Sequence, residues 1–292
     1  MRTLVSLLSF VAVTYCFIVP PLEDEAYADA VARSDMLPLA AAAYSKKPDE
    51  CLTKVFGGQL KRQVTVKCDL ARDSCSGYTA LLPKNNAIVV SFRGTDRFLQ
   101  LITESNQAIF KDKIVWPAGG KVSKYFYDAF MDVWTKGMKD DFLSLKNANP
   151  TYQVWVTGHS LGGAMASLAA SYIVTSGMVP ASKVHLYTFG QPRTGDKDWS
   201  SAHDGQNMVA TYRVTHWRDV VPHVPPEHLE GYRHHKFEAF YKSHMKEGAP
   251  FTVCTGDEDN KCSDGLDITT SIEDHLHYFE KDISEWGEKG CK

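Results

Sequence analysis

The sequence of 292 residues lacks several features that mark common classes of protein. Its net charge is only −3, which gives no reason to expect nucleic acid as a partner. It has no C-x-x-C pair and no cysteine–histidine cluster with zinc spacing, so no metal or organic cofactor is expected. Beyond the N-terminus no stretch is long and apolar enough to cross a bilayer, and repeats, low-complexity tracts and usable N-glycosylation sequons are missing. What remains is a chain that is 43% hydrophobic and long enough for one α/β domain.

The N-terminus has the pattern of a secretory signal peptide. Arg2 supplies a positive start, Leu4–Val13 is apolar but too short for a membrane span, and Thr14-Tyr15-Cys16 offers small residues where a signal peptidase would cleave. The sequence therefore predicts a signal peptide over residues 1–16, a single domain over residues 17–292, and secretion to the extracellular space. The alternative is an uncleaved anchor or a buried helix.

The cysteines agree with secretion. Seven are present, and removal of Cys16 leaves an even number, as expected for a disulfide framework. Spacing favours two short disulfide loops, and the two cysteines left over would join the ends of the mature chain. The predicted pairs are Cys68–Cys75, Cys254–Cys262 and Cys51–Cys291.

The stretch from Tyr152 to Ala170 has the pattern strand, sharp turn, helix, with Ser160 at the apex. Strand-forming residues precede the G-x-S-x-G sequence Gly158–Gly162, and an alanine-rich run follows it. Such a turn lifts the serine hydroxyl clear of the sheet, and its glycines let the strand and the helix pack closely. The start of the helix would stabilise an oxyanion formed beside it. Ser160 is therefore predicted to be a nucleophile; the alternative is a glycine-rich turn before a helix.

The rest of the chain alternates between strand and helix patterns, which predicts an α/β fold with a mainly parallel sheet covered on both faces. Before the parallel strands, the segment Lys61–Leu82 is expected to form strands joined by a hairpin, which the predicted Cys68–Cys75 disulfide would close. The expected helices are Asp24–Tyr44 and Tyr125–Ser144, and the expected strands lie in Lys61–Leu82, Ala87–Phe92, Lys183–Phe189 and Ala210–Trp217.

The expected strand Ala87–Phe92 ends in a tight turn that leads to Thr95. A turn of this kind beside the serine can present one backbone N–H to the reacting carbonyl. Thr95, together with Leu161 just after the nucleophile, is therefore a candidate oxyanion donor. An equally supported alternative makes Thr95 an ordinary helix N-cap.

Apolar residues at helical spacing follow this turn, among them Phe98, Leu101, Ile102 and Ile109. They predict a short amphipathic helix. It either packs on the core or forms a lid that covers the serine and turns its apolar face to a lipid surface. Its position directly after the candidate oxyanion turn favours the lid.

A serine nucleophile needs a base, and the base needs an orienting acid. In folds with a serine elbow the chain order is serine, acid, histidine. Asp219 follows a strand directly and is favoured over Asp196, which follows one less closely. Many histidines lie near or after Asp219. The segment Ile272–Phe279, expected to be a loop that enters the final helix, carries His275 and His277, and this argument does not separate them.

Several motifs, in order, give the chain a resemblance to the class 3 lipases, the fungal-type triacylglycerol lipases of the α/β-hydrolase fold, and most of all to secreted nematode members. The resemblance covers the chain from about Ala40 to the C-terminus. The motifs are Val90–Thr95, Val156–Ala164, Thr188–Asp196, Arg213–Pro222 and the histidine-containing Asp274–Phe279.

The resemblance implies a role for each candidate residue. It implies Ser160 as nucleophile, Asp219 as acid and His275 as base, with Thr95 and Leu161 as oxyanion donors. It also implies that the helix after Thr95 is the lid, and two of the predicted disulfides, Cys51–Cys291 and Cys68–Cys75, match pairings of fungal members. The chain departs from the family in two places: Leu101 stands where several fungal lids have tryptophan, and Ser123-Lys124-Tyr125 replaces a His-x-Gly segment.

The expected function is that of a secreted carboxylic ester hydrolase acting on acylglycerols at an oil–water or membrane interface. Neither a cofactor nor an obligate protein partner is expected. The enzyme alternatives are a phospholipase A1 and a feruloyl-type esterase for soluble esters. The amphipathic stretch after Thr95 argues against the second of these, because it favours lipids over soluble esters. The alternative from another class is a non-catalytic lipid carrier, against which the presence of every candidate catalytic residue argues.

Overall fold

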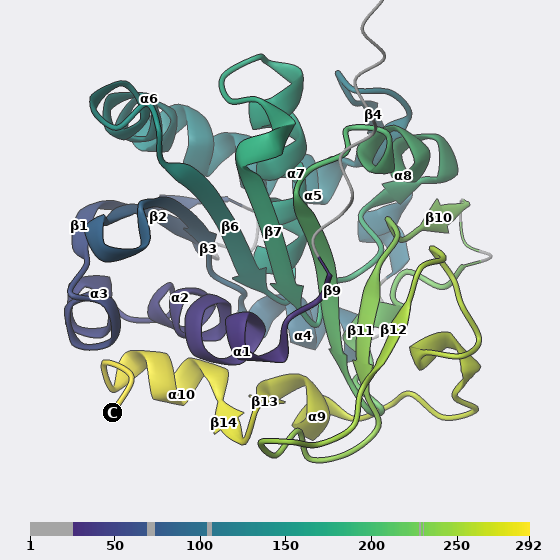
Figure 1. Cartoon of the computed structure of the whole chain (residues 1–292). Coiled ribbons are helices and arrows are strands. Elements are labelled where there is room, and N and C mark those ends of the chain that lie inside the picture. Colours follow the sequence, from purple (N-terminus) through teal and green to yellow (C-terminus); the bar gives the residue numbers. More distant parts are fainter. Residues whose placement is uncertain (1–25, 69–73, 104–106, 228, 230) are drawn as a thin grey trace, which may run out of the picture.

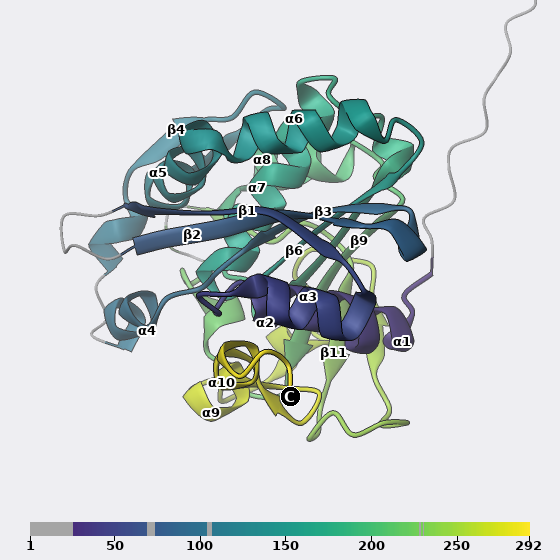
Figure 2. The same cartoon turned by 90° about the vertical axis from the view of Figure 1, so that its left-hand side faces the viewer.

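A central sheet carries helices on both of its faces (Figures 1 and 2). The computed structural model describes residues 26–68, 74–103, 107–227, 229 and 231–292, so the predicted signal peptide lies outside the described residues. The sheet has the strand order β1-β2-β3-β6-β7-β9-β11-β12. Its strands are β1 (Gln59–Lys67), β2 (Ser74–Leu82), β3 (Ala87–Phe92), β6 (Gln153–His159), β7 (Val184–Phe189), β9 (Ala210–His216), β11 (Glu238–Tyr241) and β12 (Thr252–Cys254).

The middle of this sheet is parallel. Strands β3, β6, β7, β9 and β11 pair in parallel, whereas β1 and β2 form an antiparallel hairpin that continues onto β3, and β12 pairs antiparallel with β11. Strand β3 is an unbroken apolar run apart from one serine, and all its residues are buried. That composition is typical of a strand with helices on both sides. The predicted α/β fold with a mainly parallel sheet is confirmed.

The helices form a layer on each face of the sheet (Figure 2). One face carries a continuous N-terminal helix that consists of α1 (Asp29–Val31), the π-helical segment Ala32–Met36 and α2 (Leu37–Ala42). The same face also carries α3 (Pro48–Phe56) and α10 (Ile283–Glu288). On the opposite face lie α5 (Lys124–Val133), α6 (Lys139–Ala148), α7 (Leu161–Thr175) and α8 (Lys197–Asp204). Two short helices, α4 (Asp96–Thr103) and α9 (Ile272–Leu276), lie near the ends of strands.

Two smaller sheets complete the described part of the chain. One has the order β10-β8-β5-β4, and the other pairs β13 with β14. Their strands are β4 (Lys113–Val115), β5 (Lys121–Ser123), β8 (Gly195–Asp196), β10 (Tyr232–Arg233), β13 (His277–Tyr278) and β14 (Lys281–Asp282).

Each helix layer packs on the sheet around a large hydrophobic core, and a small third cluster contains Phe240, Cys254 and Cys262. The first core includes aromatic residues of α5, where Phe126 and Phe130 are fully buried. The second core includes the alanines of α2, and every residue of that helix is buried. Because alanine side chains are short, α2 can lie close to the sheet.

Some elements differ from the sequence prediction. The N-terminal helix begins at Asp29, after its predicted start. Helix α3 was not predicted, although it has a proline at its start and Gly57 at its end with φ +62°, both ordinary boundary signals. The helix predicted over Tyr125–Ser144 is longer and interrupted, because Gly137 has φ +128° between α5 and α6.

Three disulfides join the pairs that the sequence analysis predicts. Cys68–Cys75 and Cys254–Cys262 close short loops, with Cα–Cα distances of 5.5 and 6.2 Å. Cys51–Cys291, with a Cα–Cα distance of 5.1 Å, joins α3 to the C-terminus across 240 residues of sequence. None of the described helices is long and apolar enough to cross a membrane.

Candidate active site

Ser160 lies at the tip of the sharp turn between β6 and α7. Its backbone has φ +61° and ψ −132°, a conformation that costs energy for any residue with a side chain and is typical of functional sites. A β-carbon on Gly158 would lie 2.2 Å from the carbonyl oxygen of Gly162, and one on Gly162 would lie 2.3 Å from that of Phe92. Only glycine fits at either position, so the strand, the turn and the helix can pack this closely.

The imidazole of His275 meets the carboxylate of Asp219 below this turn. Nδ1 of His275 lies 2.9 Å from both carboxylate oxygens, and both side chains are buried. Because a carboxylate can only accept, Nδ1 carries the proton and Nε2 keeps a free lone pair. The same carboxylate also accepts the backbone N–H of Val221 (2.8 Å) and the hydroxyl of Tyr278 (2.7 Å).

These contacts keep Asp219 ionised. Burial alone would raise the pKa of this carboxyl group, but its electrostatic interaction with the His275 ring and the hydrogen bonds from its neighbours outweigh burial, so the pKa of Asp219 lies below its usual value. Burial and then the negative charge of Asp219 raise the pKa of Tyr278 well above its usual value. Tyr278 therefore remains a hydrogen-bond donor to the carboxylate.

Two polar atoms of the site have no partner. Ser160 Oγ and His275 Nε2 are both buried, and neither makes a hydrogen bond to a described residue. Buried polar atoms without partners are costly and rare, and in free enzymes catalytic hydrogen bonds are often long until substrate binds. Ser160 is only 2% exposed and His275 is fully buried, so both reactive atoms are closed off from solvent in this structure.

His159, the variable residue inside the G-x-S-x-G motif, supports His275 from the side. The two rings stack with centroids 4.4 Å apart. Nε2 of His159 donates to the carbonyl oxygen of His275 (2.8 Å), and Nδ1 accepts from the Tyr44 hydroxyl (2.7 Å). Burial, followed by the positive charge of a protonated His275, lowers the pKa of His159 to about 3. His159 therefore stays neutral and does not compete for the proton of its neighbour.

The sequence analysis assigned no role to His159, Tyr278 or Tyr44. The first two stand in motifs that it singled out, beside Ser160 and His275, so their position in the sequence was a usable signal. Tyr44 stands at the end of an alanine-rich helix, far from every motif, and nothing in the sequence links it to the site.

The turn after β3 lies against the serine elbow. A β-carbon on Gly94 would lie 2.9 Å from Cβ of Ser160. Oγ1 of Thr95 accepts the N–H of Phe98 (3.0 Å), so the side chain of Thr95 is a helix cap, as one of the two alternatives predicted. The backbone N–H groups of Thr95 and Leu161 both stand at the start of a helix, where no intrahelical acceptor is available. Because only the side chain of Thr95 makes the cap, its backbone N–H is still a candidate oxyanion donor.

Helix α4, the predicted lid, turns apolar side chains inward. Phe98 is fully buried, stacks on Tyr125 (centroids 6.0 Å apart) and meets Phe126 edge-on (5.7 Å). Ile102 is partly buried against the same core, and the side chain of Leu101 lies outside the described residues. In this structure α4 packs on the core, as one of the two alternatives from the sequence predicts, and the lid stays a prediction.

The structure separates the alternatives that the sequence left open. His275 lies in the short helix α9, so the prediction of a loop at this position was wrong. His277 points elsewhere, with Nδ1 near the backbone oxygen (3.0 Å) and the carboxylate (3.2 Å) of Glu273. Asp196 caps α8 by accepting the N–H of Trp199 (2.9 Å), so it is occupied away from His275.

Four buried histidines predict a loss of stability in acid. Burial lowers the pKa of His159 and His203 to about 3, and of His234 and His235 well below the usual value. In the unfolded chain these groups take up protons below about pH 6.5, so each costs roughly 1.4 kcal/mol per pH unit below that value. Asp204, whose pKa burial raises to about 6, has the opposite sign and offsets part of the loss. The loss should therefore run from about pH 6.5 towards pH 3.

Urea unfolding followed at several pH values between 7.5 and 4.5 measures this effect. We expect the free energy of unfolding to fall steadily below pH 6.5. A flat profile from pH 7.5 to pH 5 would show that these histidines are not buried in the neutral form.

A strained serine elbow after a parallel strand, with a buried histidine–carboxylate pair beyond later strands, defines an α/β-hydrolase. Within this class, a family model described as lipase (class 3) matches residues 89–229. Lipase ZK262.3 of Caenorhabditis elegans is 35% identical over 302 residues, which covers 92% of this chain and 84% of that one. The chain belongs to the class 3 lipase family.

Two further comparisons agree. A secreted mono- and diacylglycerol lipase of Fusarium solani is 36% identical over 217 residues, which covers 70% of this chain and 61% of that lipase. A solved structure described as a triacylglycerol lipase whose catalytic centre is a serine protease triad has a TM-score of 0.71 and 26% identity, and the match covers 84% of this chain and 92% of that one. The fold and the family are thus the same by sequence and by structure.

Proposed function

We propose that this chain is a secreted lipase that hydrolyses acylglycerol esters with Ser160, His275 and Asp219 as its catalytic triad. One observation carries the assignment. In a buried site, His275 is fixed through Nδ1 by an ionised carboxylate, while its Nε2 and the Ser160 hydroxyl make no hydrogen bond to any described residue. A base oriented in this way and a serine at a strained turn are the parts that acyl transfer requires.

The reaction would run through an acyl-enzyme. His275 Nε2 takes the proton of Ser160 as Oγ attacks the ester carbonyl, and Asp219 stabilises the imidazolium. The protonated His275 then gives its proton to the leaving alcohol. Water activated by the same nitrogen releases the fatty acid. Because His159 stays neutral at neutral pH, it adds no second positive charge beside the imidazolium.

The backbone N–H groups of Thr95 and Leu161 would hold the oxyanion. Support comes from the contact of the Gly94 turn with Ser160 and from the position of Leu161 at the first turn of α7. The partial positive charge at the start of α7 favours negative charge there. Both residues would donate through the backbone, so side-chain substitutions would test this role only indirectly.

Lipid is the favoured substrate class because α4, which directly follows the candidate oxyanion turn, is amphipathic. Its Phe98 and Ile102 pack on the core, and a lipid interface could draw such a helix outward. The names of the similar proteins include a mono- and diacylglycerol lipase and a triacylglycerol lipase, which supports acylglycerols over phospholipids or aromatic esters. A lipid carrier would need none of the serine, histidine and aspartate geometry.

Secretion is part of the proposal. The disulfides require an oxidising compartment to form, and the sequence of residues 1–16 has the pattern of a signal peptide. A secreted relative in Fusarium is consistent with this.

The deciding experiment compares a soluble short-chain ester with a triglyceride across the solubility limit of each substrate. We expect low activity on dissolved ester and a sharp rise in rate once an emulsion forms, because the covered site opens at an interface. Full activity on dissolved ester with no rise would favour an esterase. Release of fatty acid from phospholipid but not from triglyceride would favour a phospholipase A1, and inactivity of folded protein on all substrates would favour the carrier.

A further inference from the structure

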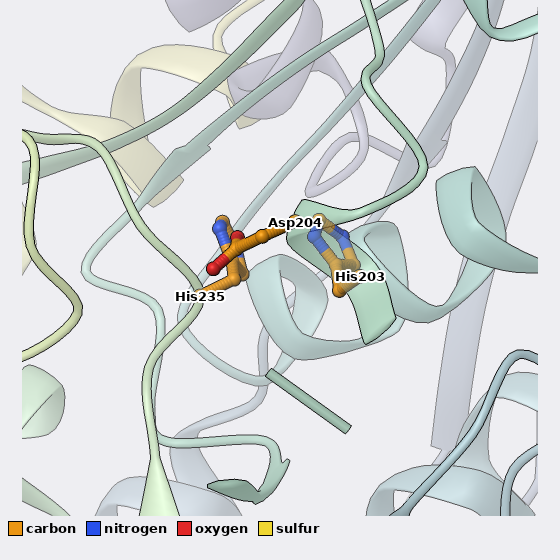
Figure 3. Close-up of side chains that lie close together, drawn as sticks. All are labelled: His203, Asp204 and His235. Atoms are coloured by element: carbon orange, nitrogen blue, oxygen red, sulfur yellow. The ribbon is translucent and has the colours of Figure 1, made fainter. Parts of the chain in front are cut away.

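His203, Asp204 and His235 form a compact group outside the catalytic machinery (Figure 3). The first two end helix α8, and the third follows β10. One ligand atom of each lies within 4.8 Å of the others, and among the described residues this is the group of histidine and carboxylate side chains compact enough to hold a metal ion. The sequence analysis expected no metal, because it searched for zinc spacing along the chain and these residues converge only in the fold.

His203 is buried with both ring nitrogens unpartnered. It is 1% exposed, and neither Nδ1 nor Nε2 makes a hydrogen bond to a described residue. The carbonyl of Ser167 faces the ring but outside hydrogen-bonding geometry. An imidazole in a protein interior normally has at least one partner, so the two free nitrogens lack a group to bind.

The hydrogen bonds of His235 are also incompletely satisfied. Its Nδ1 lies 3.2 Å from the carbonyl oxygen of Lys236, and its Nε2 lies 3.2 Å from Oε1 of Gln191, which already accepts the Thr188 hydroxyl. Both nitrogens face acceptors, yet a neutral imidazole has a single N–H. One lone pair of His235 therefore faces an oxygen with no proton between them. A second proton is disfavoured, because burial and the neighbouring charge of Arg213 oppose it.

Asp204 supplies the anionic member. It is partly exposed, and one of its oxygens accepts the N–H of Lys236 (3.0 Å), which leaves the other for a ligand. Arg213 and Lys236 contribute positive charge nearby, and Asp257 contributes negative charge. The positive and negative charges around Asp204 therefore nearly cancel, so the ligand atoms themselves must attract a cation.

From these contacts we propose that His203, Asp204 and His235 bind a divalent cation of the zinc class. Two imidazole nitrogens and one carboxylate oxygen suit zinc, with water in the fourth position on the exposed side of Asp204. The cation would give His203 its missing partner and occupy the lone pair of His235. It would tie the end of α8 to the segment after β10.

The ordinary alternative is a pair of packed histidines. Their rings are nearly parallel, with centroids 4.3 Å apart and an angle of 21°, and His203 also packs on Trp199 (5.3 Å). Zinc binds nitrogen at about 2.0–2.1 Å, so its ligand atoms stand roughly 3.3 Å apart. Binding therefore requires the imidazoles to rotate and the group to contract. Two histidines that are only packed together would not rearrange around added metal and would bind none. The experiment distinguishes the two cases by the amount of zinc that the protein binds.

The experiment uses the full secreted chain after removal of metal with a chelator. Zinc is added, and one portion is freed of excess zinc by gel filtration so that the bound metal can be counted. The melting temperature of a second portion is measured with excess zinc present. We expect about one zinc per chain and a rise in melting temperature of about 5 °C at a hundredfold excess over Kd. The tetrahedral spectrum of Co²⁺ in place of zinc reports imidazole ligation without any assay of lipase activity.

Asp204→Asn is the test variant, because the amide keeps its shape and still accepts the N–H of Lys236. It should weaken zinc roughly tenfold or more. Asp198→Asn, on the exposed face of the same helix, and His244→Ala, at a separate exposed histidine, should bind like wild type. Absence of zinc binding in folded wild type, unchanged binding by the Asp204→Asn variant, or loss of binding in the His244→Ala variant would overturn the proposal.

Discussion

Ser160→Ala should lose ester hydrolysis by about four to six orders of magnitude while the protein stays folded. The change removes the Oγ that attacks the ester, and no other hydroxyl stands at the strained turn. Alanine keeps the β-carbon, so the backbone conformation at φ +61° is no more costly than in wild type. The rate is measured on both dissolved and emulsified ester, and melting temperature and circular dichroism report the fold.

Ser200→Ala is the matched control. Ser200 is also a buried serine, but its hydroxyl donates to the carbonyl oxygen of His234, away from the elbow. It should cost stability and leave the rate per folded molecule nearly unchanged. If the Ser160→Ala variant kept near-normal activity, the assignment of the nucleophile would be wrong, whatever the family.

The parts of the fold that could be predicted from sequence are those that depend on local chemistry. The apolar run Ala87–Phe92 had to be a strand buried on both faces, and the glycines around Ser160 had to allow a close turn. Asp219 and Asp196 both follow predicted strands in the sequence. Asp219 was favoured as the acid only because it stands closer to the end of its strand. In each case a few adjacent residues determine the structure, so the sequence contains the information.

The parts that could not be predicted depend on contacts between distant segments. Tyr44 bonds His159 across 115 residues of sequence, and His203 meets His235 only because α8 and the segment after β10 fold together. His275 and His277 stand two residues apart, so local sequence chemistry does not separate them. The family resemblance favoured His275, and its contact with Asp219 distinguishes the two in the structure.

Asp219→Asn should reduce kcat/KM by about four orders of magnitude. The amide is isosteric, but its NH₂ group can donate a proton where His275 needs an acceptor, so the imidazole is held in the wrong tautomer and Nε2 no longer serves as base. The negative charge that stabilises the imidazolium is also lost. Because Tyr278 and Val221 both donate to this carboxylate, part of the site must rearrange around the amide. The pH profile separates this effect from simple misfolding: the residual activity should rise at high pH, where hydroxide can replace the missing base.

Asp196→Asn is the sharp control, because Asp196 was the rival acid in the sequence. An asparagine oxygen can still accept the N–H of Trp199, so the start of α8 keeps its cap and the rate should stay within about twofold of wild type. The two variants carry the same chemical change, the loss of one carboxylate charge, at two aspartates that the sequence offered as the acid. A large loss in the Asp196→Asn variant with near-normal activity in the Asp219→Asn variant would mean that the buried pair of His275 and Asp219 is structural, and the acid of the triad would have to be sought at α8.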